Sequence, residues 1–133
     1  MVAELISVGT EILLGNIVNT NAAYLAEKCA LLGLSLYHQS VVGDNEARME
    51  DTIRRALERS DVVILTGGLG PTKDDLTKEV TAKVFKKALC EDAHTKERIM
   101  EFFQKIHNGE KITENNWKQA LIPEGAIIVE NQN

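Results

Sequence analysis

Ten residues in the middle of the chain decide the fold: Thr66-Gly67-Gly68-Leu69-Gly70-Pro71-Thr72-Lys73-Asp74-Asp75. Residues 61–65 before them are almost wholly apolar, which is typical of a strand buried on both faces of a parallel sheet. Residues 76–88 after them repeat apolar side chains at helical spacing. A strand, a glycine turn and a helix in this order predict a loop at the carboxyl edge of an α/β sheet, where such sheets bind ligands.

The residues before this loop alternate between apolar strands and amphipathic helices. In chain order the pattern predicts a strand over 3–8, a helix over 22–32 ending at Gly33, a strand nearer the sheet edge over 34–42, and a helix over 49–57. Asp44 or Asn45 is placed to cap the second of these helices. With the strand over 61–65, the elements form a β-α-β-α-β unit.

The residues after the loop predict further helices and one last strand. The patterns indicate helices over 76–88 and 99–106, a short helix over 114–120, a turn over 122–125 and a strand over 126–130. Strands that alternate with helices favour an α/β fold class. We expect a three-layer, doubly wound and mostly parallel sheet with right-handed crossovers.

The composition is that of one domain over residues 1–133. Hydrophobic residues make up 44% of the chain, and the net charge of −5 offers no broad basic surface for duplex DNA. The first residues contain no signal-peptide or membrane-span pattern. Cys29 and Cys90 lack metal or C-x-x-C spacing, which favours free thiols in a reducing compartment. We expect a cytoplasmic protein without direct DNA or membrane partners.

The glycine loop has the properties of a phosphate site. Without side chains, Gly67, Gly68 and Gly70 can turn sharply and direct several N–H groups at an oxyanion near the start of a helix. Close packing alone would also call for glycines here. A Walker A loop is excluded, because Thr72-Lys73 runs into Asp74, and the dinucleotide fingerprint is excluded because its third glycine and its acidic residue are missing. Thr72 and Lys73 are further candidates for phosphate binding.

Two carboxylates directly follow the glycines. Asp74 and Asp75 would repel a phosphate unless a divalent cation lay between them, and such oxygen ligands suit Mg²⁺ or Mn²⁺. Asp44 ends a neighbouring strand and is a candidate for the same metal-binding cluster. The simpler alternatives are helix caps: Asp75 or Thr77 for the helix over 76–88, and Asp44 for the helix over 49–57.

The loop over 9–21 carries polar residues on both sides of an apolar stretch. Thr10, Glu11, Asn19 and Asn21 are candidates for binding the ribose, base or pterin part of a ligand. The apolar residues over 12–18 either pack beneath the site or contact another subunit. Both alternatives remain open at the level of sequence.

Five segments of the chain resemble the amino-terminal domain of the competence/damage-inducible CinA family. They are VGTEILLG at 8–15, NTN at 19–21, VVGDN at 41–45, TGGLGPTKDDLT at 66–77, and TENN at 113–116 with QA at 119–120. The resemblance implies the molybdopterin-binding fold, a homo-oligomer, and hydrolysis of ADP-ribose at its pyrophosphate with Mg²⁺, Mn²⁺ or Co²⁺. It assigns metal binding or catalysis to Asp75 and Asp44, with Asp74 assisting.

The resemblance also bears on the extent of the domain and on two alternative functions. Family members continue beyond the strand expected over 126–130, so we expect the domain to be incomplete at its carboxyl end, and the deamidase domain that many members carry is not expected in this chain. Transfer of an adenylyl group to molybdopterin is one alternative to hydrolysis. A non-catalytic module for ligand binding or assembly is the other.

Overall fold

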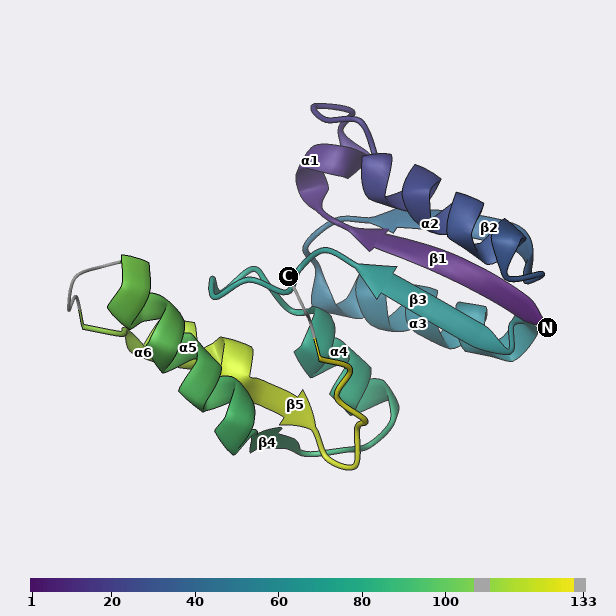
Figure 1. The fold of residues 1–133 in the computed structure, drawn as a ribbon. Coiled ribbons are helices and arrows are strands. Elements are labelled where there is room, and N and C mark those ends of the chain that lie inside the picture. Colours follow the sequence, from purple (N-terminus) through teal and green to yellow (C-terminus); the bar gives the residue numbers. More distant parts are fainter. Residues whose placement is uncertain (107–110, 131–133) are drawn as a thin grey trace.

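The computed structural model describes residues 1–106 and 111–130. It consists of a three-layer part around a parallel sheet and a smaller part that contains a two-stranded antiparallel sheet (Figure 1). None of the helices within these residues is long and apolar enough to cross a membrane.

The parallel sheet has three strands in the order β2-β1-β3. The central strand β1 (Val2–Val8) pairs with β2 (Ser35–Val42) on one side and β3 (Val62–Thr66) on the other. The predicted edge position of β2 is therefore confirmed among the described strands. Because all three strands run in the same direction, their carboxyl ends meet at one edge, which is the edge predicted to hold the site.

Helices cover both faces of this sheet, as the α/β prediction requires. Ala3 and Leu5 of β1 pack with Cys29 of α2 (Thr20–Leu31) on one face. The alternate residues of β1, Ile6 and Val8, pack on the other face. Their partners come from α3 (Glu46–Arg59) and α4 (Thr77–Val84): Met49, Ile53, Ala56, Val80 and Val84. Burying each large apolar side chain contributes about 1.5–3 kcal/mol, so the two clusters hold the three layers together.

One buried residue of the sheet is charged. Glu4 of β1 is fully buried, and its carboxylate accepts hydrogen bonds from Arg59 Nε at 2.9 Å and Arg59 Nη2 at 2.7 Å. The Ser60 hydroxyl donates to the same carboxylate at 3.2 Å. The hydrogen bonds from Arg59, assisted by Ser60, lower the pKa of Glu4 against the opposing effect of burial. The carboxylate therefore stays ionised inside the sheet.

Side-chain caps define where α2 and α3 begin. Asn19 Oδ1 accepts from the N–H of Ala22, and Asn45 Oδ1 accepts from the N–H of Arg48, both at 3.1 Å. Of the two caps proposed for α3, Asn45 is the one that forms. Gly33 has φ +72° directly after α2, as a glycine after a helix often does. The short helix α1 (Thr10–Leu13) lies inside the segment that was expected to be a loop.

The smaller part differs from the prediction in two places. Helix α4, which was expected over 76–88, ends at Val84, and a turn leads from it into β4 (Leu89–Glu91). The strand expected over 126–130 is wrong: β5 (Leu121–Pro123) pairs with β4 instead. An apolar run shows a preference for strands but does not provide a partner, and Ile127 and Val129 are 92% and 88% exposed.

Three helices complete the smaller part. They are α5 (Ala93–Ile106), α6 (Glu114–Trp117) and the 3₁₀ helix η1 (Lys118–Ala120). Sequence predicted their approximate positions, with α5 beginning earlier than expected. No residue of α5 is buried. Figure 1 shows the loop after β3 extending from the parallel sheet toward α5 and α6.

Candidate functional site: the glycine loop

Two glycines begin the loop, and both are required by its geometry. Gly67 has φ +89°, and a Cβ atom there would lie 2.0 Å from the carbonyl oxygen of Val8. Gly68 has φ +60°, and its Cβ atom would lie 2.4 Å from Thr77 Oγ1. The Thr77 hydroxyl donates to the Gly67 carbonyl at 2.7 Å. The loop is therefore fixed between the end of β1 and the start of α4.

Asp75 closes the second half of the loop into a turn. Its Oδ2 atom accepts from the Thr72 hydroxyl at 2.6 Å and from the Thr72 N–H at 2.9 Å. The Thr72 hydroxyl lowers the pKa of Asp75 most strongly, and the N–H groups of Thr72 and Gly70 and the charge of Lys118 add to it against burial. Helix α4 begins at Thr77 with no side-chain cap, so the alternative that Asp75 or Thr77 only caps the helix is wrong.

The first half of the loop offers free donors. Among the residues that the structure describes, none accepts a hydrogen bond from the N–H groups of Gly68 and Leu69. The side chains of Lys73 and Asp74 are exposed at the tip of the loop and make no hydrogen bond within that same part of the chain. The loop can therefore present two amides and a lysine to an anion, beside the ionised Asp75.

A lysine of η1 that the sequence analysis did not identify binds the main chain of the loop. Lys118 of η1 donates its Nζ to the carbonyl oxygens of Thr72, at 2.8 Å, and Asp75. The same ammonium lies 3.2 Å from Glu79 Oε1. Nothing in the local sequence around Lys118 indicates a contact more than forty residues away. Its only signal in the sequence was its position between the family segments TENN and QA.

Asp44 lies at the same edge of the sheet, after β2. Its Oδ2 atom accepts from the Thr10 hydroxyl at 2.8 Å and from the Thr10 N–H at 3.2 Å. In return, Thr10 Oγ1 accepts from the N–H of Asp44 at 3.1 Å. Asp44 therefore joins the end of β2 to the start of α1, and it does not cap α3. Glu11, the next residue of α1, is exposed and lies over Gly9.

Asn19 and Asn21 bind side chains at the carboxyl ends of β1 and β3. Asn19 Nδ2 donates to Ser7 Oγ at 2.9 Å, while its other side-chain atom caps α2. Asn21 Nδ2 donates to Thr66 Oγ1 at 3.3 Å. The candidates Thr10, Asn19 and Asn21 are thus drawn to the edge where β1, β2 and β3 end. Each of them already holds part of the protein in place.

The residues fit a divalent cation only in part. In residues 1–106 and 111–130, no three His, Cys, Asp or Glu side chains gather closely enough to hold a metal ion. Mg²⁺ commonly binds proteins through one or two carboxylates and completes its shell with water and substrate phosphates. Asp75, whose carboxylate is held ionised in the loop, is the residue best placed to serve as such a ligand, with Asp44 at the same sheet edge.

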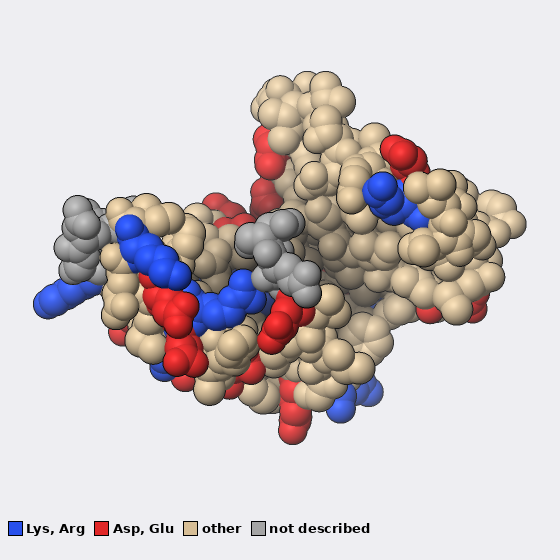
Figure 2. Space-filling model, in the orientation of Figure 1, with Lys and Arg blue, Asp and Glu red and all other residues tan. Residues whose placement is uncertain are grey.

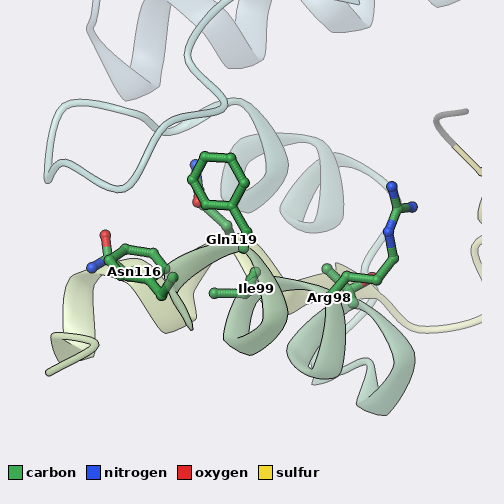
Figure 3. A pocket seen from close by; sticks show the side chains of 7 residues that line it. Arg98, Ile99, Asn116 and Gln119 are labelled. Atoms are coloured by element: carbon green, nitrogen blue, oxygen red, sulfur yellow. The ribbon is translucent and has the colours of Figure 1, made fainter. Parts of the chain in front are cut away.

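A cavity of about 390 Å³ opens between α5, α6 and η1. Figure 3 shows Ile99 of α5 and the side-chain amides of Asn116 and Gln119 around it, with the guanidinium of Arg98 pointing away. The rings of Phe102 and Phe103 meet edge to face at 6.1 Å on the same side of the molecule. Gln119 directly follows Lys118, so the cavity adjoins the residue that binds the glycine loop. The sequence did not predict this cavity.

The surface around these elements carries mixed charges. Figure 2 shows Lys and Arg side chains interspersed with Asp and Glu over the part that contains α5, β4 and β5. The same face is hollowed between this part and the three-layer part.

Known proteins resemble the chain over almost its whole length. A family model described as "Probable molybdopterin binding domain" matches residues 4–130. A competence-damage inducible protein of Clostridium beijerinckii is 52% identical over 133 residues, which are all of this chain and 32% of the relative. A CinA-like protein of Kosmotoga olearia is 55% identical over 98% of this chain and 31% of its own length. The chain thus spans about a third of these curated relatives.

Solved structures give the same result for the fold. The crystal structure of the protein CinA from Thermoplasma acidophilum superposes with a TM-score of 0.83 at 37% identity, covering 98% of this chain and 75% of that one. The tungsten cofactor synthesizing protein MoaB from Pyrococcus furiosus superposes with a TM-score of 0.60 at 20% identity, over 80% and 65% of the two chains. The second similarity concerns the fold alone.

Proposed function

Because this chain belongs to the molybdopterin-binding-domain family and, within it, to the CinA proteins, we propose that it hydrolyses a nucleotide pyrophosphate. ADP-ribose is the substrate we propose. Water adds across the pyrophosphate, one P–O bond breaks, and AMP and ribose 5-phosphate leave.

One observation carries the proposal: free amides lie next to an ionised carboxylate. The N–H groups of Gly68 and Leu69 have no acceptor among the described residues, and Asp75 is kept ionised by Thr72. Amides ahead of a helix bind a phosphate oxygen and orient the pyrophosphate. The carboxylate then orients the attacking water, with Lys73 and Thr72 lying close to the phosphate charge.

Residues at the neighbouring strand ends hold the remainder of the substrate in this proposal. Thr10, Glu11, Asn19 and Asn21 lie at or beside the edge formed by β1, β2 and β3. A bound Mg²⁺, Mn²⁺ or Co²⁺ would supply charge neutralisation and a more acidic water, and Asp75 or Asp44 would hold it as a protein ligand, with water and substrate phosphates completing its shell.

The direct test is product formation. Purified protein is mixed with ADP-ribose and each of Mg²⁺, Mn²⁺ and Co²⁺, and AMP is measured by chromatography. Asp75→Asn should lower the rate by about 10²-fold or more, the scale of a positioned acid–base group. Asp51→Asn is the matched control, because Asp51 pairs with Arg55 on the exposed face of α3. Absence of AMP under all three metals would contradict the proposal.

The matched family favours one second candidate, binding of a pterin at the same loop. If the domain also transfers an adenylyl group from ATP to molybdopterin, ATP and molybdopterin would be consumed together with release of pyrophosphate, and ADP-ribose would not be consumed. A non-catalytic module would bind ADP-ribose in a calorimeter without turnover, and Asp75→Ala would leave the binding unchanged. The three candidates therefore give different results with the same protein and ligands.

A further inference from the structure

Two lysines tie the glycine loop to the segment over 114–120. Lys118 of η1 reaches the carbonyl oxygens of Thr72 and Asp75, as described above. Lys78 of α4 reaches in the opposite direction and donates to the carbonyl oxygens of Lys118, at 2.8 Å, and Gln119, at 3.1 Å. Lys78 and Lys118 therefore join the same two segments in opposite directions.

All three donors of the Lys118 ammonium have acceptors. Two of these acceptors are the carbonyl oxygens of Thr72 and Asp75, and the third is Glu79 Oε1. The ammonium therefore has no donor left for a ligand. The side chain of Lys118 is only 20% exposed. Its contacts therefore act on the loop from within the protein.

The loop needs this support, because residues 71–75 belong to no helix or strand. Lys118 holds the carbonyls at both ends of the Thr72–Asp75 turn, and the Asp75 carboxylate accepts from Thr72 inside the same turn. If the turn moved, the position of the Asp75 carboxylate relative to the amides of Gly68 and Leu69 would change with it.

We infer that Lys118 is a positioning residue of the glycine loop, which fixes the Asp75 carboxylate through the two main-chain carbonyls of the Thr72–Asp75 turn. The segment over 114–120 is thereby part of the site, although none of its residues needs to contact the reacting phosphate. The inference rests on the proposed function for its catalytic consequence, but the placement of the turn can be tested without any activity.

Glu79 provides a way to separate stability from positioning. Its Oε1 atom pairs with Lys118, and its Oε2 atom is buried without a hydrogen-bond partner among the described residues. Removing the lysine alone leaves this carboxylate without its cation, which destabilises the fold for a reason unrelated to the loop. The double variant Lys118→Met/Glu79→Gln removes the charge imbalance and still lacks the contact with the turn.

The first experiment uses NMR on the free protein. In Lys118→Met and in the double variant, the backbone amide shifts of Thr72 to Asp75 should change from their wild-type values. Lys118→Arg keeps a donor and the charge and should retain most of the wild-type shifts. Lys83→Met is the matched control: Lys83 also lies on α4 but pairs with Glu46 and Glu50.

The second experiment measures kcat and KM for ADP-ribose hydrolysis. Both Lys118→Met variants should lose roughly tenfold to a hundredfold in kcat with KM nearly unchanged, the effect of a small misplacement of a reacting group, and Lys118→Arg should restore most of the loss. Glu79→Gln alone and Lys83→Met should keep the wild-type kcat.

The outcomes separate the inference from the proposed function. A wild type that does not hydrolyse ADP-ribose refutes the function, while the NMR result still decides the role of Lys118. Unchanged Thr72–Asp75 amide shifts in the double variant would overturn the inference, even if the single variant is less stable.

Discussion

At the scale of single residues, Gly67 links the fold to the site. Its backbone passes so close to Val8 that no side chain fits, and its carbonyl is held by the hydroxyl of Thr77. The sequence predicted that glycines here would serve a phosphate or close packing. The structure shows that Gly67 and Gly68 are needed for close packing. The N–H groups of Gly68 and Leu69 have no acceptor among the described residues, which is compatible with the phosphate hypothesis.

Gly67→Ala tests this packing. A methyl group 2.0 Å from the Val8 oxygen forces the loop away from β1, and φ +89° adds strain, so the free energy of unfolding should fall by about 3 kcal/mol or more. Gly33→Ala is the control, since Gly33 has φ +72° but open space around it, and should cost about 1–2 kcal/mol. Urea unfolding measures both, and equal losses would contradict the packing argument.

Thr72 sets the ionisation of Asp75. Removing its hydroxyl in Thr72→Val takes away the strongest influence that lowers the pKa of Asp75, so this pKa should rise toward its ordinary value. Because the folded pKa is the lower one, Asp75 stabilises the wild type above its ordinary pKa, and this contribution is lost as the pH falls through the folded value. Titration of the carboxyl by NMR measures the change. Thr52→Val, whose hydroxyl donates only to the Arg48 carbonyl, should leave the titration unchanged.

At the scale of elements, the sequence predicted the β-α-β-α-β unit because its signals are local. The short, largely apolar sequence of β1, the asparagine caps and Gly33 each depend on residues close in the chain. The antiparallel pairing of β4 with β5 was missed because it joins short strands about thirty residues apart, and the apolar run over 126–130 was a stronger signal. Helix α1 was missed because four residues give too little periodicity to detect.

The pair Glu4–Arg59 joins β1 to the end of α3. Arg59→Met leaves a buried carboxylate without its partner and should cost about 2–3 kcal/mol at pH 7, less than a fully buried pair because Arg59 is 44% exposed. Arg59 keeps the pKa of Glu4 below 4.5, so the pair stabilises the protein above that pH and its contribution is lost as the pH falls through the folded value.

Urea unfolding of the wild type and Arg59→Met at pH 7 and at pH 3 checks both the size and the sign. The difference between the two proteins should shrink at the lower pH. Arg55→Met, which removes an exposed pair with Asp51 on the same helix, should cost at most about 1 kcal/mol at either pH. A penalty for Arg59→Met that grows on acidification would contradict the assignment.

At the scale of the whole molecule, the strand order explains why part of the site could be predicted. Strands β1, β2 and β3 run in parallel, so Thr10, Asp44 and the glycine loop had to reach one edge. Lys118 could not be predicted in the same way, because its contact with the loop depends on how the pairing of β4 with β5 places η1. The cavity beside η1 depends on the same placement and was missed for the same reason.

Several large apolar side chains are exposed on the segment between β1 and α2. Leu13, Leu14, Ile17 and Val18 are all exposed, Leu14 by 68% and Val18 by 83%. Such a group on one segment is typical of an interface, and we propose that it supports a homo-oligomer. Leu14→Asp/Val18→Asp should shift the protein toward monomer in sedimentation experiments. Leu31→Asp, at an exposed position on α2, is the control. A wild type that is monomeric at high concentration would contradict the proposal.

The position of β1 has a consequence for how the chain folds as it is made. Of the three strands of the parallel sheet it is synthesised first, and it is also the central one, so both of its partners are made after it. After Val8 is made, β1 stays without a complete sheet until Thr66 follows, a delay of about 3–12 seconds at ordinary rates of translation. During that time the N–H and C=O groups of β1 lack strand partners, and slower translation of the residues between β1 and Thr66 lengthens this exposure.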